Sequence, residues 1–313
     1  NPATPLYTLE EAKRVLPMFR VVEPNLEVKL ADNCWFKLFY AGHVLGACSL
    51  EIHVEDKILI FSGDIGQDDD VLMYPPIKPK QADYVFLEST YGNRIHPQEN
   101  VLLELETIIN NTVNRNGNVV IPSFAVERVQ TMMYLIWQLR KQERIPNIKY
   151  IIDTPMGISV LDIFRENLKW HKLTAKDCEE MCDTFTLISD YQDTVTAIYD
   201  ENPKVVIAAS GMVTGGRVLS YLERYIIEPE NTVILVGFQA EGTRGRRLLE
   251  GEKEIKFHGK FYPVHANIIS IEGLSAHGDQ NDSLNRISEL EKPPTKIFLV
   301  HGELDVQTIF KEK

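Results

Sequence analysis

The chain has 313 residues, of which 44% are hydrophobic and 25% are charged, as in an ordinary folded globular protein. This length predicts one large domain or two smaller ones. No run of about 18 apolar residues occurs, and the first residues lack a basic stretch followed by an apolar one, so neither a membrane span nor a signal peptide is predicted. The formal net charge of −12 argues weakly against a nucleic-acid binder, although bound divalent cations can attract phosphate to an acidic protein.

The chain has four cysteines, and no two of them form a Cys-x-x-Cys pair. Four thiols in a chain of this length are too few for a disulfide framework. A reducing, cytoplasmic location is therefore the simplest expectation.

β-Branched and aromatic residues predict strands in the first third of the chain, over 35–40, 47–54, 57–61 and 84–87. From near Asn93, helical patterns alternate with short apolar strands. Helices are predicted over 103–113 and 126–140, and strands over 118–122, 149–152, 204–209 and 232–236. This alternation predicts a mainly parallel sheet with helices on both faces, and ligands in such sheets bind at the C-terminal strand ends.

After about Gly273 the pattern returns to that of the first third, with a strand predicted over 296–300 and a helix that includes 310–313. The middle of the chain is therefore interpreted as a domain inserted into an outer one. The predicted boundaries are 1–92 and 274–313 for the outer domain and 93–273 for the inserted one.

Three polar residues stand at the ends of predicted apolar strands, where a rigid backbone can present a ligand. Asp64 follows the strand at 57–61, Glu88 follows the strand at 84–87, and His301 follows the strand at 296–300. Asp and Gly also terminate strands routinely, so ordinary turn chemistry is the alternative for each residue alone.

Two histidines lie in glycine-containing turns: His43 in Gly-His-Val-Leu-Gly and His277 in Ser-Ala-His-Gly-Asp. Imidazole nitrogen and carboxylate oxygen suit zinc or manganese. A carboxylate can also bridge two metals about 3.5–4 Å apart, as two-metal hydrolases require.

The order of these motifs resembles that of the β-CASP nucleases, the RNA-processing branch of the metallo-β-lactamase superfamily. The matching strings are 41–47, 62–64, 88–92, 274–277 and 300–303, and the inserted-domain blocks are 122–130, 153–156, 209–212 and 237–243. The resemblance implies an α/β fold, in which an αββα metallo-β-lactamase sandwich is interrupted by a β-CASP domain with a mainly parallel, helix-flanked sheet.

The resemblance also implies roles for these residues. His43, Asp64 and His301 correspond to ligands of two divalent ions, zinc with manganese as the alternative, and Asp64 is the carboxylate that bridges them. Glu88 and His277 correspond to the pair that handles the proton of the leaving group. A carboxylate beside an imidazole raises the imidazole pKa and orients its ring, which suits a general acid.

RNA is the implied substrate, since a histidine at the position of His301 is typical of the RNA-directed members. Ser210, Gly211 and Ser275 are candidates for substrate binding, with the backbone N–H groups of Ser210 and Gly211 available for a phosphate. Arg244 lies in the densest basic cluster, which can contact an RNA backbone or simply form a solvated helix face.

Other polar residues are given structural or surface roles. Arg128 and Gln130 are expected to set helix packing. His96 and His171 stand beside Pro97 and Lys172 in predicted loops and are expected at the surface.

The first ligand block of the family, His-x-His-x-Asp-His, has no counterpart, because no His-x-His occurs in the sequence. The expectation is a chain truncated at both ends that is inactive by itself and derives from a metal-dependent ribonuclease of RNA processing or decay. The alternative is a non-catalytic subunit that binds RNA or a partner and keeps the fold. The resemblance also makes a homodimer plausible.

Overall fold

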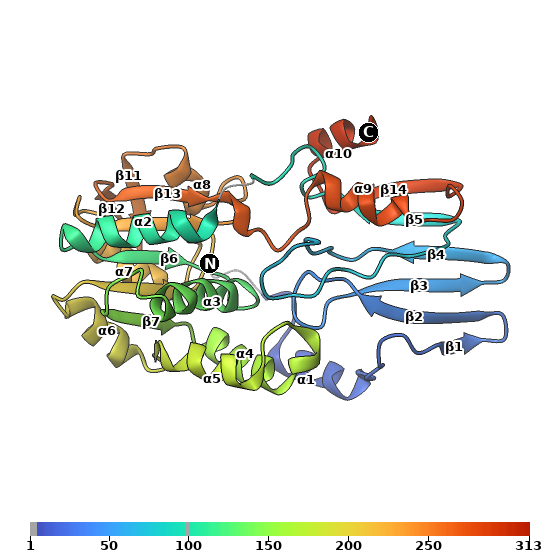
Figure 1. The fold of residues 1–313 in the computed structure, drawn as a ribbon, viewed down its shortest axis with the longest axis horizontal. Coiled ribbons are helices and arrows are strands. Elements are labelled where there is room, and N and C mark those ends of the chain that lie inside the picture. The colour runs from blue at the N-terminus through green and yellow to red at the C-terminus, as the bar shows by residue number, and fades with distance from the viewer. Residues whose placement is uncertain (1–4, 98–99) are drawn as a thin grey trace.

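The computed structural model describes residues 5–97 and 100–313, and it contains two six-stranded sheets that lie end to end (Figure 1). Strands β4 (Lys57–Phe61) and β5 (Tyr84–Glu88) of one sheet run toward the middle of the molecule, where their C-terminal ends face those of β6 (Val119–Pro122) and β7 (Lys149–Asp153) of the other. This arrangement places the candidate site between the sheets.

The first sheet has the strand order β1-β2-β3-β4-β5-β14. Its strands are β1 (Val28–Ala31), β2 (Cys34–Tyr40), β3 (Cys48–Val54), β4 (Lys57–Phe61), β5 (Tyr84–Glu88) and β14 (Lys296–Val300). Strands β1 to β4 form an antiparallel meander, and β5 and β14 then add in parallel to β4. Strands β2, β4, β5 and β14 therefore all run in the same direction.

Helices cover one face of the first sheet. Leu284 of α9 (Gln280–Ser288) and Phe310 of α10 (Leu304–Lys311) pack with Ile60 and Leu87 of the sheet. On the opposite face, the rings of Phe61, Phe86 and Phe298 stack across neighbouring strands with centroids 4.4 and 4.8 Å apart. This aromatic face is only partly buried within the described part of the chain.

The second sheet has the strand order β13-β10-β6-β9-β7-β8, and all its strands are parallel. Its strands are β6 (Val119–Pro122), β7 (Lys149–Asp153), β8 (Thr186–Leu187), β9 (Lys204–Ala208), β10 (Thr232–Val236) and β13 (Asn267–Ile271). The central strands are apolar and buried on both faces, as helix-covered parallel strands must be.

Helices flank the second sheet on both faces. One face packs against α2 (Val101–Asn114), α3 (Arg128–Lys141), α4 (Pro155–Glu166) and α5 (Ala175–Asp183). The other packs against α6 (Tyr191–Tyr199), α7 (Val218–Tyr225) and α8 (Arg244–Leu249). The predicted α/β class, with a mainly parallel sheet between helices, is confirmed.

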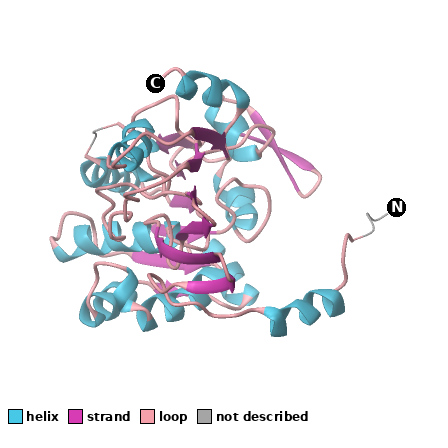
Figure 2. Ribbon diagram, turned by 90° about the vertical axis from the view of Figure 1, so that its right-hand side faces the viewer, coloured by secondary structure: helices cyan, strands magenta, loops and turns pink. Residues whose placement is uncertain are grey.

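Several short elements complete the described chain. They are α1 (Leu9–Val15), η1 (Leu16–Met18), η2 (Leu168–Trp170), η3 (Glu272–Leu274) and the hairpin of β11 (Glu254–Phe257) with β12 (Lys260–Pro263). Helix α1 buries no side chain and extends from the body near the N-terminus (Figure 2). Among the described helices, none combines the length and the apolar character that a membrane crossing requires.

The predicted strands at 57–61, 232–236 and 296–300 coincide with β4, β10 and β14. The chain enters the first sheet over 28–88, builds the second over 119–271, and returns to the first at 296–300. The residue boundaries proposed for the inserted domain stay a prediction.

The expectation that His171 lies at the surface is wrong. Its side chain is fully buried, and its ring stacks on Phe164 of α4 with centroids 3.7 Å apart. Nε2 lies 3.0 Å from the Phe164 carbonyl oxygen, and burial lowers the pKa of His171. A neutral, hydrogen-bonded imidazole in the core accounts for this placement.

A buried carboxylate ties the second sheet to α7. Asp153, the last residue of β7, is fully buried and accepts a hydrogen bond of 2.6 Å from Arg217 Nη1 and one of 2.7 Å from the Tyr221 hydroxyl. Burial and the Asp153 carboxylate raise the pKa of Tyr221, so its hydroxyl remains a donor. The network offsets the cost of burying a charge at the end of a strand.

Replacement of Tyr221 by Phe should lower the free energy of unfolding by about 1.5–3 kcal/mol, the usual worth of a hydrogen bond to a charged group. Urea denaturation followed by circular dichroism measures the change. Tyr191→Phe is the matched control, since Tyr191 is exposed and its hydroxyl has one long contact, with Ser220 Oγ at 3.3 Å. Equal effects of the two substitutions would contradict a stabilising role for the Asp153 network.

Candidate active site

Four candidate residues stand at the C-terminal ends of the four strands that run in the same direction in the first sheet. His43 follows β2, Asp64 follows β4, Glu88 ends β5, and His301 follows β14 directly. Strands that run in the same direction bring their C-terminal ends to one edge of the sheet, so side chains more than 200 residues apart in the chain become neighbours.

A close backbone approach fixes the loops that carry His43 and Asp64. The Gly66 N–H donates to the Ala41 carbonyl oxygen at 2.8 Å. A Cβ atom at Gly66 would lie only 2.0 Å from the Gly42 carbonyl oxygen, so only glycine permits this contact. Sequence reasoning missed Gly66, because its partner lies on the other loop.

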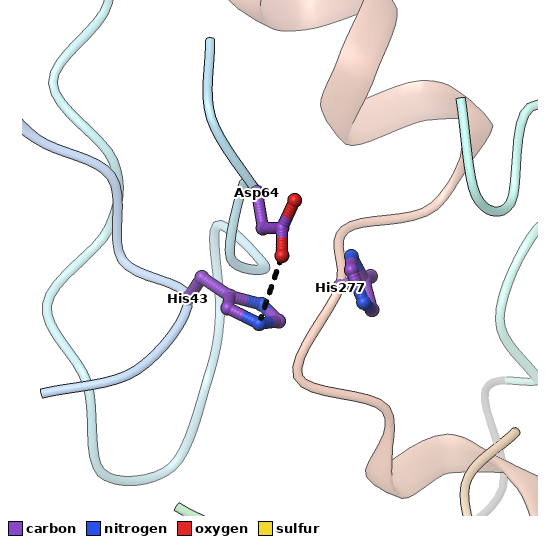
Figure 3. A group of neighbouring side chains, drawn as sticks. All are labelled: His43, Asp64 and His277. Atoms are coloured by element: carbon purple, nitrogen blue, oxygen red, sulfur yellow. Dashed lines mark ion pairs between the residues drawn. The ribbon is translucent and has the colours of Figure 1, made fainter. Parts of the chain in front are cut away.

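Asp64 lies between two imidazole rings. Its Oδ2 atom is 3.8 Å from His43 Nε2, and its Oδ1 atom is 3.5 Å from His301 Nε2. Figure 3 shows His43 and Asp64 approaching from one side and His277 from the other. His43, Asp64 and His277 each offer one ligand atom, and these three atoms lie within 4.8 Å of one another. The donors therefore converge on a common point.

The backbone holds His301 in an unusual conformation. Its φ angle is +53°, in the left-handed region that non-glycine residues rarely adopt. The Thr90 hydroxyl oxygen lies 3.0 Å from the His301 carbonyl oxygen, so this turn sits beside the end of β5. Such conformations persist where the surrounding structure imposes them, and they cluster at functional sites.

Glu88 and His277 form a direct pair. Nδ1 of His277 lies 3.0 and 3.2 Å from the two carboxylate oxygens of Glu88. The Thr90 hydroxyl donates to Glu88 Oε2 at 2.7 Å, and the Ile65 N–H donates to Oε1. Glu88 is buried, so these donors replace the water that its carboxylate has lost.

The pKa values of the two partners shift in directions that agree. Burial alone would raise the pKa of Glu88, but the contacts with His277, Ile65 and Thr90 lower it below its usual value. Burial alone would lower the pKa of His277, but the Glu88 carboxylate raises it. The pair is therefore an ionised carboxylate with an imidazole that retains its proton more strongly than usual.

His43 has the opposite electrostatic character. Burial, followed by the neighbouring His277, lowers its pKa, and the two ring centroids are 4.4 Å apart. Its Nδ1 atom is buried without a hydrogen bond of normal geometry among the described residues, although the Ala276 backbone lies close enough to raise the pKa slightly. A neutral imidazole is the form that binds a metal.

The turn that carries His277 is held by buried polar groups. The Ser275 hydroxyl accepts from the His277 N–H at 3.2 Å, and His96 Nε2 lies 2.9 Å from the His277 carbonyl oxygen. The His96 N–H also donates to Asp279 at 2.9 Å. The expectation that His96 lies at the surface is therefore wrong, since it is buried against this turn.

A cleft of about 740 Å³ lies between the two sheets. The strand ends of the first sheet contribute His43 and His301, and the turn before α9 contributes His277. The second contributes residues that follow β6, β7, β9 and β10, namely 124–128, Met156, Met212, and Gly237 with Phe238. Both sheets therefore present their C-terminal strand ends to the same space, where parallel sheets bind ligands.

The substrate-binding candidates lie in different settings. Ser275 lines the cleft, whereas the Ser210 hydroxyl accepts from the Thr214 and Gly215 N–H groups at 3.0 and 3.2 Å within its own loop. A Cβ at Gly211 would lie 2.7 Å from the Phe124 ring. Arg244 lies outside the residues that line the cleft, and its guanidinium donates to the carbonyl oxygens of residues 213, 214 and 256. The substrate-binding roles of all four stay predictions.

The donor set fits a divalent metal. Imidazole and carboxylate are ligands of zinc and manganese, and here Asp64 converges with His43 and His277, which both line the cleft. The incomplete hydrogen bonding of His43 Nδ1 is consistent with a ring that a ligand would complete. His301 lies on the second oxygen of Asp64, outside this group of three converging donors.

Two family models match the chain. Residues 129–248 match the Beta-Casp domain, and residues 262–313 match the Zn-dependent metallo-hydrolase RNA specificity domain. The first covers β7 to β10 and their helices, and the second includes the turn of His277 and the end of β14.

Curated relatives match over most of the chain. An RNase J-like protein of Methanocaldococcus jannaschii is 30% identical over 305 residues, which are 96% of this chain and 71% of that protein. A ribonuclease of Thermus thermophilus is 30% identical over 84% of this chain and 61% of its own length. The transcription termination factor FttA of M. jannaschii is 28% identical over 95% of this chain and 49% of its own length. The chain thus spans from about half to 71% of the length of these three relatives, and it belongs to the β-CASP, RNA-processing nuclease family of the metallo-β-lactamase superfamily.

Proposed function

We propose that this chain carries part of the active site of a ribonuclease that hydrolyses RNA phosphodiester bonds with two divalent metal ions. The single observation that carries the proposal is the position of Asp64. One of its carboxylate oxygens faces His43 and the other faces His301, at 3.8 and 3.5 Å. A carboxylate placed in this way between two imidazoles can serve two ions at once.

His43, Asp64 and His301 would hold the ions, with zinc favoured and manganese as the alternative. When bound, such ions lower the pKa of a coordinated water and neutralise charge on a phosphate. The contribution of the chain is to hold these side chains on rigid strand ends. His277 also has a ring nitrogen within 4.8 Å of the ligand atoms of His43 and Asp64, so it could serve as a metal ligand or as a proton donor. Its contact with Glu88 favours the role of proton donor.

Glu88 would keep His277 as a proton donor. The carboxylate lies 3.0 Å from Nδ1, so Nε2 of the same ring remains available toward the cleft that His277 lines. Because Glu88 raises the pKa of His277, the ring holds its proton more strongly than an ordinary imidazole and can pass it to a leaving oxygen. Thr90 and the Ile65 N–H fix the carboxylate in that position.

Three observations favour RNA as the substrate. One matching family model is described as an RNA specificity domain, and two of the matched relatives are named as ribonucleases or RNase J-like. His301 agrees with the RNA-directed branch of the resemblance.

The alternative, a non-catalytic subunit that binds RNA or a partner, is favoured by one observation. No His-x-His pair occurs in this sequence, so the donor set around Asp64 is short of ligands. Metal affinity rises with the number of ligands in a preformed site. The proposal therefore assigns hydrolysis to a protein in which further ligands complete this set, and not to the 313 residues alone.

The 313-residue chain alone should not cleave RNA in the presence of zinc or manganese, because the ligands around Asp64 are too few to hold two ions. The measurement is incubation of the purified chain with end-labelled RNA and gel analysis of the products. Cleavage that depends on metal and disappears with chelator would overturn the expectation.

In a protein that supplies the remaining ligands, Asp64→Ala should lower the rate of RNA cleavage by about 10³-fold or more, since loss of the bridging charge removes several kcal/mol of transition-state stabilisation. Asp56→Ala, in the exposed turn between β3 and β4, is the matched control and should leave the rate unchanged. Undiminished cleavage by the Asp64 variant would sink the bridging role.

Glu88→Gln should lower the pKa of His277, because burial then acts without the opposing carboxylate charge. A histidine-detected NMR titration of the metal-free chain measures this shift. Glu223→Gln is the control, since Glu223 lies 2.8 Å from His258, outside the cleft, and should leave His277 unchanged. An unaltered His277 titration in the Glu88 variant would refute its role in preparing the acid.

A further inference from the structure

Arg128 is a buried cation in the wall of the cleft, and it has no role in the proton-handling or metal-binding groups. It begins α3, directly after the loop that follows β6, and its side chain is only 7% exposed. It lines the cleft together with His277, and it also lines the neighbouring acidic cavity of about 700 Å³. A buried guanidinium normally has its donors satisfied.

The donors of Arg128 are poorly satisfied by the described residues. Its Nε atom is buried without a hydrogen-bond partner. Its one ion pair is with Glu127, whose Oε2 atom is 3.5 Å from Nη2, a contact too long for a good hydrogen bond. Burial also raises the pKa of Glu127, which weakens its ability to neutralise the guanidinium.

Glu127 is occupied by a different contact. The Thr131 hydroxyl donates to Glu127 Oε1 at 2.6 Å, one turn further along α3. Glu127 adopts φ +64°, and no side chain caps the N-terminus of this helix. The helix start therefore presents the positive end of its dipole and an incompletely paired guanidinium to the same place.

The guanidinium lies where the two sheets meet. A Cβ atom at Gly237, the residue after β10, would lie 3.5 Å from Arg128 Nη2, so the absence of a side chain there leaves this side of the guanidinium uncovered. Arg128 is also close enough to His277 to lower the pKa of that imidazole. An anion bound here would therefore lie next to the proposed proton donor.

We propose that Arg128, at the N-terminus of α3, binds a phosphate oxygen of single-stranded RNA in the cleft and so positions the nucleotide beside His277. This inference rests on the proposed function for its ligand and deepens it by naming a positioning residue of the second sheet. Arginine suits the task, because its planar fork can donate two parallel hydrogen bonds to one phosphate. Phosphate also supplies the full negative charge that Glu127 does not.

The test measures RNA binding and not cleavage, so it is independent of metals. A fluorescein-labelled 12-residue oligouridylate is titrated with the 313-residue chain in chelator, and anisotropy is recorded at several salt concentrations. Arg128→Gln should weaken binding at least tenfold. It should also reduce the slope of log affinity against log salt by about 0.7, the value for one lost contact to a single strand. If Arg128 affected binding only through the packing of α3, the slope would stay unchanged.

Arg224→Gln is the matched control. Arg224 lies on α7, outside the residues that line the cleft, and its charge is paired with Glu228. This substitution should change neither the affinity nor the slope. If Arg128→Gln does not fold by circular dichroism, Arg128→Lys carries the test, because it keeps the charge but loses the fork and should weaken binding at least threefold.

The outcomes separate the two proposals. Equal affinity and slope for the wild-type chain and the folded Arg128 variant would overturn the phosphate role of Arg128 alone. Absence of any binding by the wild-type chain would overturn both this role and RNA as the substrate. A loss confined to the Arg128 variants would support the inference even if the cleavage experiments failed.

Discussion

The candidate metal ligands and Arg128 depend on one constraint: the C-terminal strand ends of both sheets face the same cleft. In the first sheet, β2, β4, β5 and β14 run in the same direction and bring His43, Asp64, Glu88 and His301 to one edge. In the second, the residues after β6 and β10 form the opposite wall. Short loops on rigid strands hold such groups with little freedom, so the geometry does not need a ligand to form.

The two walls of the cleft differ in how well their charged groups are paired. On the first sheet, Asp64 stands between two imidazoles and Glu88 is paired with His277, so each acidic group has a basic neighbour. On the second sheet, Arg128 has only a long contact with Glu127. A net charge of −12 therefore does not predict the local potential, because a few buried groups outweigh distant surface charges within the low-dielectric cleft.

The sequence predicts what is local. The strand ends at Asp64, Glu88 and His301 could be predicted because each polar residue lies next to an apolar run in the sequence. The order of the motifs, which resembles that of the β-CASP nucleases, then indicated that these residues form one site. His96 could not be placed, because its partners are the backbone of His277 and the side chain of Asp279, about 180 residues away. Gly66 was missed for the same reason, since its requirement for glycine arises from the Gly42 carbonyl on another loop.

The two arginines show why burial and pairing decide function better than charge density. Arg244 belongs to the most basic stretch of the sequence, so charge density alone would favour it as a phosphate contact. Its guanidinium, however, already donates to three backbone carbonyl oxygens. Arg128 is a single basic residue at a helix start and is expected from sequence to pack the helix. The fold buries it beside a glycine and leaves Nε unpaired. Since an unsatisfied buried cation is costly, the proposed phosphate contact would complete the hydrogen bonding of this guanidinium.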